Sequence, residues 1–195
     1  MRITNLTCDY MSNPIGFDFK NPSFGWMTES DAVNGSQSAY QLQVATDAAF
    51  EALVADTGKT DCDLSAGIRI GVELKPRTRY FWRVRIWNEK GERSDWSDAA
   101  WFETGKYGEP WAARWIGWDR EFPQLRKDFA LDKPVKSARA YACGVGLYAL
   151  YLNGERVGDE YLAPGFNAYD SWLQYQTYDV TEQLRRGGNA IGCRL

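Results

Sequence analysis

The side chains that could do chemistry in this sequence are carboxylates, since it holds 26 aspartates and glutamates and no histidine. Without histidine, the chain alone cannot build a Ser–His–Asp or Cys–His nucleophilic site. Two opposed carboxylates could still act as general acid and base. Asp159 and Glu160 do not fit that role, because adjacent strand residues point to opposite faces. Together with Asp128 and Asp132 they are expected to be solvated charges, so no catalytic residue is predicted.

Metal-binding patterns are missing as well. Four cysteines are spread singly along the chain: Cys8, Cys62, Cys143 and Cys193. Without a C-x-x-C pair or a histidine, they cannot form a zinc site of the usual type. The acids of residues 56–63 lack the spacing of a calcium loop. We predict no metal and no cofactor, and four reduced thiols, which favour a cytoplasmic protein.

Aromatic side chains offer a different chemistry, which is stacking on the C–H face of a sugar ring. The chain has nine tryptophans and eleven tyrosines. The rings that could stack on a sugar in the second half are Tyr148, Tyr151, Trp172, Tyr175 and Tyr178. The alternative for each ring is packing in a core or between domains, which is the commoner role.

Strands must position these side chains, because apolar residues alternate with polar ones along much of the chain. Residues 40–44 and 80–86 show this period of two, and turn residues separate such runs. Only residues 47–54 could hold a turn or two of helix, with Asp47 as its N-cap. Short strands at this spacing predict an all-β sandwich.

The second half also reads as β-structure. Strands are expected at residues 127–131, 138–143 and 189–195. Residues 147–152 are apolar on both faces, as in a central strand, and Asn153-Gly154 then predicts a type I′ hairpin turn. A short helix is expected to begin at residues 179–182.

Three segments follow from this pattern: a sandwich at residues 1–105, a linker at 106–114 and a second sandwich at 115–195. The linker lacks alternation and contains Gly and Pro. Three tryptophans in or near it are expected to pack the two domains together: Trp111, Trp115 and Trp118.

Charge and hydropathy exclude two classes of partner. The net charge is −3, and no run of Lys or Arg exceeds two residues, so nucleic-acid binding is not expected. No stretch of about 18 apolar residues exists, and Met1 leads into no signal-type segment, so a membrane role is not expected either.

One segment makes the sandwich specific. Leu74-x-Pro76-x-Thr78-x-Tyr80 resembles the corner of a fibronectin type III domain, and the resemblance covers residues 1–105. It implies a buried Tyr80 whose hydroxyl bonds to nearby backbone, and a buried Trp26 on an early strand.

Further motifs extend the resemblance over nearly the whole chain. They are Trp96-Ser97, Phe102-Glu103-Thr104-Gly105, Trp115-Ile116, Leu125-Arg126-Lys127-Asp128-Phe129, Leu162-Ala163-Pro164-Gly165-Phe166 and Tyr175-Gln176-Thr177-Tyr178-Asp179. In this order they resemble the N-terminal region of bacterial α-L-rhamnosidases, glycoside hydrolase family 78. The resemblance implies a fibronectin type III or immunoglobulin-like sandwich, then the first part of a jelly-roll, galactose-binding-like sandwich.

The same resemblance implies a role without catalysis. In the family, a downstream (α/α)₆ barrel hydrolyses α-L-rhamnosides. Residues 1–195 are therefore expected to be inactive alone and to have a structural role in domain docking. Rhamnosylated glycosides are then partners of the parent enzyme. Two alternatives stay open, a carbohydrate-binding module of weak affinity and a protein-interaction module. The expected incompleteness of the second sandwich further predicts self-association through residues 112–195, either by pairing along an unpaired edge at residues 189–195 or by domain exchange.

Overall fold

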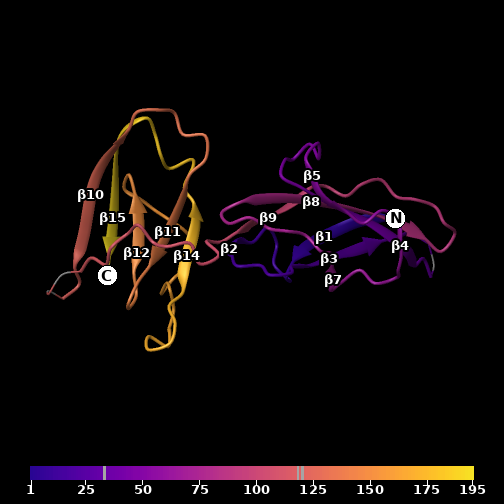
Figure 1. Ribbon diagram of the computed structural model, residues 1–195, viewed down its shortest axis with the longest axis horizontal. Coiled ribbons are helices and arrows are strands. Elements are labelled where there is room, and N and C mark those ends of the chain that lie inside the picture. Colours follow the sequence, from indigo (N-terminus) through magenta and orange to yellow (C-terminus); the bar gives the residue numbers. More distant parts are fainter. Residues whose placement is uncertain (33, 118, 120) are drawn as a thin grey trace. The chain divides into compact units, whose positions relative to one another are not determined.

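The computed structural model describes residues 1–32, 34–117, 119 and 121–195. The chain divides into two compact units, Met1–Glu109 and Pro110–Leu195, and each has its own hydrophobic core. Strands form every regular element in the described ranges, so the predicted all-β class is confirmed (Figure 1). Across the same ranges, no helix is long and apolar enough to span a membrane.

The described residues of the first unit form nine strands in two sheets. They are β1 (Arg2–Cys8), β2 (Ile15–Phe17), β3 (Ser23–Glu29), β4 (Gln37–Ala45), β5 (Leu53–Asp56), β6 (Thr60–Asp61), β7 (Ile68–Arg69), β8 (Arg79–Asn88) and β9 (Ala100–Thr104). One sheet has the order β1-β3-β7. The other has the order β2-β9-β8-β4-β5, with β6 also paired to β4. The core contains residues from both sheets, as expected of a sandwich.

The alternation in β8 explains how this core is built. Tyr80, Trp82, Val84 and Ile86 are buried, while the residues between them stay partly exposed. Since side chains alternate across a strand, one face of β8 points into the core. The predictions for Tyr80 and Trp26 are confirmed: Tyr80 is 1% exposed and Trp26 is 4% exposed.

Residues 47–54 do not form the helix suggested by the sequence. Asp47 closes a turn instead, because its carboxylate accepts hydrogen bonds from the N–H groups of Ala49 (2.9 Å) and Ala52 (2.7 Å). Phe50 has a φ of 60°, which a right-handed helix cannot accommodate. The chain therefore turns once and enters β5.

In the second unit, the part that the structure describes forms six strands, also in two sheets. They are β10 (Gln124–Leu131), β11 (Arg139–Cys143), β12 (Ala149–Leu152), β13 (Glu155–Arg156), β14 (Tyr175–Asp179) and β15 (Gly187–Arg194). One sheet has the order β10-β15-β12-β13, and the other pairs β11 with β14. The hairpin prediction is confirmed, since Asn153 (φ 52°) and Gly154 (φ 90°) connect β12 to β13.

Two expectations for this unit are wrong, and another is right only in part. The strand at residues 189–195 is not an unpaired edge, because β15 pairs with β10 on one side and β12 on the other. Residues 149–152 do form the expected inner strand, β12, between β15 and β13, but burial alternates along it and Leu147 is 49% exposed. The helix expected from residue 179 is a turn at residues 181–183. It does not continue because the Arg185 N–H donates to the Asn189 side chain.

The linker tryptophans have different surroundings. The ring of Trp111 contacts that of Tyr175 edge-on, with centroids 5.5 Å apart, inside the second unit. Trp115 is 66% exposed. Trp118 lies outside the described residues. Their expected role between the domains stays a prediction.

Candidate functional site

A ladder of arginine and aromatic side chains covers part of the larger sheet of the first unit. The guanidinium of Arg83 lies 4.1 Å from the ring centre of Phe50 and 4.4 Å from that of Trp96. The guanidinium of Arg85 lies 4.4 Å from the same Trp96 ring. Each contact is of cation–π type, so the Trp96 ring contacts two cations.

Backbone bonds fix Trp96 in that place. The hydroxyl oxygens of Ser94 and Ser97 accept hydrogen bonds from the N–H groups of Ile86 (3.0 Å) and Val84 (3.1 Å). The segment after β8 is thereby tied back along β8, where Arg83 and Arg85 project between buried residues. The two serines therefore position the ring.

The polar groups beneath the ladder are engaged with one another. The Oε1 atoms of Gln41 and Gln43 accept from Arg85 and Arg83, respectively, at 2.6–3.0 Å. Their amides both donate to the carboxylate of Asp56 at 2.7 Å. Burial works to raise the pKa of Asp56, but these bonds outweigh it and lower that pKa. The polar groups of the ladder thus bond to one another, and the ladder covers this part of the sheet.

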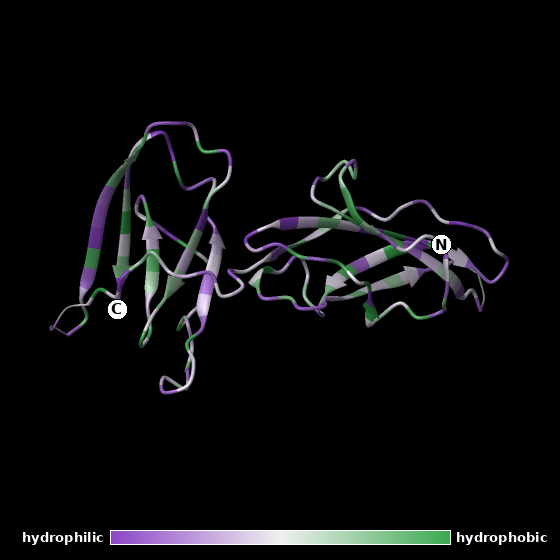
Figure 2. Cartoon of the chain, viewed as in Figure 1, coloured by the Kyte–Doolittle hydropathy of each residue, from purple (hydrophilic) through white to green (hydrophobic). Residues whose placement is uncertain are grey.

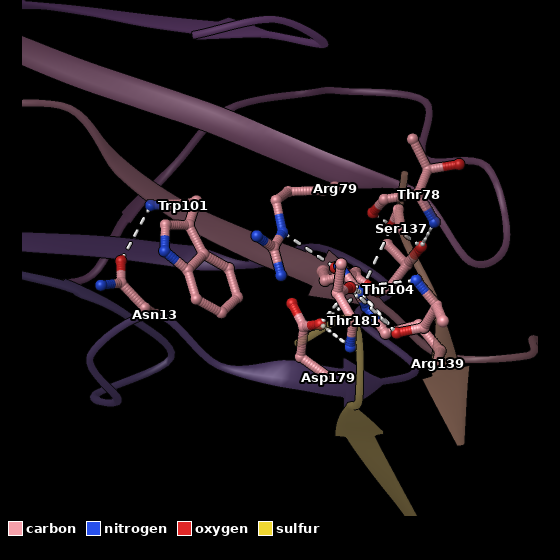
Figure 3. A network of polar contacts seen from close by, with 11 residues as sticks. Asn13, Thr78, Arg79, Trp101, Thr104, Ser137, Arg139, Asp179 and Thr181 are labelled. Atoms are coloured by element: carbon pink, nitrogen blue, oxygen red, sulfur yellow. Dashed lines mark hydrogen bonds and ion pairs between the residues drawn. The ribbon is translucent and has the colours of Figure 1, made fainter. Parts of the chain in front are cut away.

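Each unit has a further ion pair, and Figure 3 labels Arg79 of the first and both Arg139 and Asp179 of the second. In the first unit, Arg79 Nε lies 2.9 Å from the Glu103 carboxylate, and its guanidinium lies over the Trp101 ring. In the second unit, an Arg139 nitrogen lies 2.8 Å from the carboxylate of Asp179, whose neighbour Thr181 donates its hydroxyl to that carboxylate at 2.6 Å.

Three carboxyl groups have a clearly shifted pKa. Among those with a resolved shift, Asp47, Asp56 and Glu89 all have a lowered pKa. Backbone N–H donors are the main cause at Asp47 and Glu89. A general acid needs the opposite, a pKa raised towards neutrality. Among the described residues, no three His, Cys, Asp or Glu gather as a metal site would require.

The five aromatic residues considered for sugar stacking fall into two groups. Tyr148 (7% exposed) and Tyr178 (8%) belong to the core of the second unit, which leaves no ring face for a sugar. Burial is the main cause of the raised pKa of Tyr148, and the hydrogen bond with Tyr178 raises it further. Tyr151 and Tyr175 are half-buried, and Trp172 is 51% exposed.

Described residues of the second unit line a larger and a smaller hollow. One, of about 1080 Å³, lies along β10, β15 and β12, and Tyr151 and Asn153 are among its lining residues. The other is an apolar groove of about 640 Å³ lined from both sheets. We call it the inter-sheet groove, and its lining includes Trp115, Leu125, Tyr141, Tyr175 and Ile191.

Sequence reasoning missed one feature, the exposed side chains between β13 and β14. Tyr161 is 83% exposed, Leu162 70% and Phe166 92%. The sequence signal for these side chains is an apolar run that lacks strand alternation and contains Pro and Gly. The run helps to identify the family, but a sequence alone does not show which apolar residues stay outside a core.

Family comparison gives the same order of two domains. Residues 3–108 match the family described as Rha78A-like, N-terminal immunoglobulin domain. Residues 133–195 match the α-L-rhamnosidase N-terminal domain.

Individual relatives agree with this. An α-L-rhamnosidase from Streptomyces avermitilis is 42% identical in an alignment 369 residues long. The alignment covers 98% of this chain and 36% of the relative. One from Formosa agariphila is 34% identical over 217 residues, covering 94% of this chain and 23% of the relative. The chain thus spans about a quarter to a third of the length of these relatives.

Solved structures show the same partial coverage. The α-L-rhamnosidase from Dictyoglumus thermophilum has 36% identity and a TM-score of 0.91, over 100% of this chain and 25% of that one. The enzyme from Aspergillus terreus has 28% identity and a TM-score of 0.84, over 100% and 23%. The chain therefore belongs to the family of Rha78A-like N-terminal immunoglobulin domains, followed here by the N-terminal domain of α-L-rhamnosidases.

Proposed function

We propose that this chain is a non-catalytic scaffold of an α-L-rhamnosidase, in which the remaining domains hydrolyse terminal α-L-rhamnosyl residues. The observation that carries the proposal is the similarity to the Dictyoglumus thermophilum enzyme, which extends over the whole chain but only 25% of that enzyme. A scaffold acts by supplying packed, ordered surface to the domains beside it.

The chemistry of the described side chains supports this assignment. Hydrolysis of a glycosidic bond needs a carboxylic acid with a raised pKa and a second carboxylate across the bond. Here Asp56 has a lowered pKa, and Glu103 and Asp179 are held by arginines. Their roles are those of structural ion pairs and hydrogen-bond acceptors.

Domain exchange tests the scaffold role. The matching quarter of the Dictyoglumus thermophilum enzyme is replaced by this chain, and a second variant lacks that quarter. We expect the chimera to fold and hydrolyse an aryl α-L-rhamnoside, and the deletion variant to unfold at lower temperature and lose activity. A deletion variant as stable and active as the parent would refute a scaffold role.

Carbohydrate binding is the second candidate function, and the exposure of Trp172 favours it. A ring that is 51% exposed can stack on a pyranose, and Tyr151 lines the larger hollow of the same unit. Titration of the chain with L-rhamnose, followed by tryptophan fluorescence and NMR, distinguishes the two functions. Saturable shifts that disappear in Trp172→Ala, but persist in the exposed control Trp115→Ala, would establish a sugar site.

A further inference from the structure

The segment between β13 and β14 presents large apolar side chains to solvent. We call residues 159–172 the aromatic loop; in Figure 1 it extends away from the strands of its own unit. Its large exposed side chains belong to neither hydrophobic core. They are Tyr161 (83% exposed), Leu162 (70%), Phe166 (92%), Tyr169 (44%) and Trp172 (51%). A cluster of this kind on a folded surface marks an interaction site.

The backbone of the aromatic loop is held by polar contacts. Asn167 is 1% exposed, and its side-chain oxygen accepts a hydrogen bond from the Gln174 N–H at 2.9 Å. Its amide nitrogen donates to the Gly165 carbonyl at 3.3 Å. The Ala163 carbonyl accepts from the Tyr148 N–H at 2.8 Å, which ties the loop to the core of its unit. Such anchoring reduces the entropy lost when a partner binds.

Three of the exposed rings also have contacts that orient them. The rings of Phe166 and Tyr169 meet edge to face, with centroids 6.1 Å apart. The guanidinium of Arg156 lies 4.4 Å from the ring centre of Tyr161, and Arg156 also donates to the carbonyl of Glu160. Rings that are oriented before binding lose little rotamer freedom when they enter a partner's pocket, so they are suited to anchor an interface.

The aromatic loop carries acids and no cation. Asp159, Glu160 and Asp170 are exposed, and residues 159–172 contain no Lys or Arg. Figure 2 shows the resulting mixture of hydrophobic and hydrophilic residues along the loop. Since opposite charges around an apolar contact orient association, the surface that fits this loop is an apolar pocket with basic residues at its rim.

We propose that the aromatic loop docks into such a pocket on the remaining domains of the parent α-L-rhamnosidase. This inference rests on the proposed function, and it assigns to the scaffold the surface that holds those domains. The similarity to solved enzymes covers 100% of this chain but only 25% of the Dictyoglumus thermophilum chain and 23% of the Aspergillus terreus chain. Most of each enzyme therefore lies outside the matched region and is available as the partner.

The small size of the aromatic loop favours a domain of the same polypeptide over a second copy. A stable complex of separate chains uses roughly 20–30 residues from each partner, which is more than residues 159–172 provide. A domain in the same polypeptide is held near the loop at an effective concentration of about millimolar, so a small contact is sufficient.

The composition of the aromatic loop also favours a protein partner over a sugar or a lipid surface. Phe166 and Leu162 have no group that could bond to a sugar hydroxyl. The three acids of the loop are repelled by an anionic membrane surface. Protein interfaces, by contrast, combine aromatic anchors with a polar rim.

Hydroxyl-radical footprinting of the full-length parent enzyme and of the 195-residue chain tests the proposal without any substitution. We expect Phe166, Leu162 and Tyr161 to be oxidised at least about tenfold more slowly in the full-length enzyme, because docking removes them from water. The control is Tyr10, which is 81% exposed but lies in the first unit, and its rate should stay the same. Equal rates for the loop in the two proteins would overturn the proposal.

The same measurement distinguishes other occupants of the loop. Protection in the 195-residue chain that grows over a hundredfold concentration range would identify a second copy instead. Protection of that chain by added L-rhamnose would identify a sugar. Either result would overturn the proposed partner.

The substitution Phe166→Ser separates docking from folding. In the 195-residue chain it should leave the unfolding temperature unchanged, because the ring is 92% exposed. In the full-length enzyme it should raise the oxidation of Leu162 to the rate of the 195-residue chain, since the contact loses its most exposed anchor. The matched control Tyr10→Ser should leave Leu162 protected. Protection of Leu162 that Phe166→Ser does not change would overturn the proposal.

Hydrolysis of an aryl α-L-rhamnoside by the full-length protein tests the proposed function separately. A protected loop in a protein without this activity would refute the α-L-rhamnosidase assignment and leave the docking contact standing. An active enzyme in which the loop is oxidised as fast as in the 195-residue chain would refute the docking contact alone.

Discussion

The hydroxyl oxygen of Tyr80 accepts a hydrogen bond of 2.8 Å from the backbone N–H of Lys75. The ring of Tyr80 is buried and stacks on Phe102, with centroids 5.3 Å apart. The bond therefore fixes the segment before β8 against the core, as in the corner of an immunoglobulin-like domain.

Loss of this hydroxyl should weaken the first unit. We predict that Tyr80→Phe lowers the free energy of unfolding by about 1–2 kcal/mol, because the bond is lost while ring packing is kept. Urea denaturation of Tyr80→Phe and of Tyr10→Phe, a change at an exposed ring, measures the difference. Equal stability of Tyr80→Phe and the parent would remove the corner's proposed role.

Asn153 connects the hairpin to the strand beside it. Its amide donates to the Gln183 carbonyl (2.8 Å) and to Asn189 Oδ1 (2.9 Å), and its Oδ1 accepts from the Ala190 N–H (2.9 Å). We predict that Asn153→Ala destabilises the second unit by about 2–4 kcal/mol, through lost bonds and an unfavourable positive φ.

The matched control is Asn153→Gly, which keeps the positive φ but loses the same bonds. It should be less destabilising than Asn153→Ala by roughly 1 kcal/mol. Hydrogen exchange at the Ala190 N–H reports the local effect in both variants. Exchange as slow in Asn153→Ala as in the parent would contradict this role.

At Gly158, both the positive φ and the lack of space for a side chain disfavour any other residue. Its φ is +74°, and a Cβ there would lie 2.5 Å from the ring of Tyr178. Gly154 has a φ of +90° with nothing within 4 Å of such a Cβ. Both alanine variants are strained by about 1–2 kcal/mol, but Gly158→Ala should lose a further 1–3 kcal/mol by overpacking. Equal thermal stability of the two variants would argue against the tight contact with Tyr178.

Cys8 should react slowly with alkylating agents in the folded chain. Its ionisation should lower the stability of the fold in alkali. Burial, and after it the charge of Asp9, raises the pKa of this thiol from 9.0 to about 12. The folded state thus favours the neutral thiol. The contribution of this preference to the free energy of unfolding is complete below pH 9 and is lost as the pH rises from 9 to about 12. Mass spectrometry after iodoacetamide should find Cys8 modified later than the partly exposed Cys62, and equally fast after denaturation. Rapid modification of Cys8 in the folded chain would contradict its burial.

The sequence predicts much of the fold, because alternation and turn chemistry are local. The pattern of β8 and the Asn153-Gly154 turn could be read directly, since each depends on neighbouring residues. The pairing of β15 with β10 could not, because strand order depends on contacts between distant segments.

The candidate site was less predictable for the same reason. Periodicity does not distinguish Tyr148, which is buried, from Trp172, which is exposed. Contacts between distant segments decide which ring is buried, and Tyr148 belongs to the core of the second unit. Likewise, no pattern of residue types reveals that Phe166 is exposed while the neighbouring Asn167 is buried and bonded to Gln174.

If the chain is a scaffold without an active site, the purified chain will not hydrolyse an aryl α-L-rhamnoside. We expect no turnover above the buffer rate at any pH, while the Dictyoglumus thermophilum enzyme assayed in parallel is active. Turnover that survives purification, and disappears when a single Asp or Glu is replaced by its amide, would contradict it.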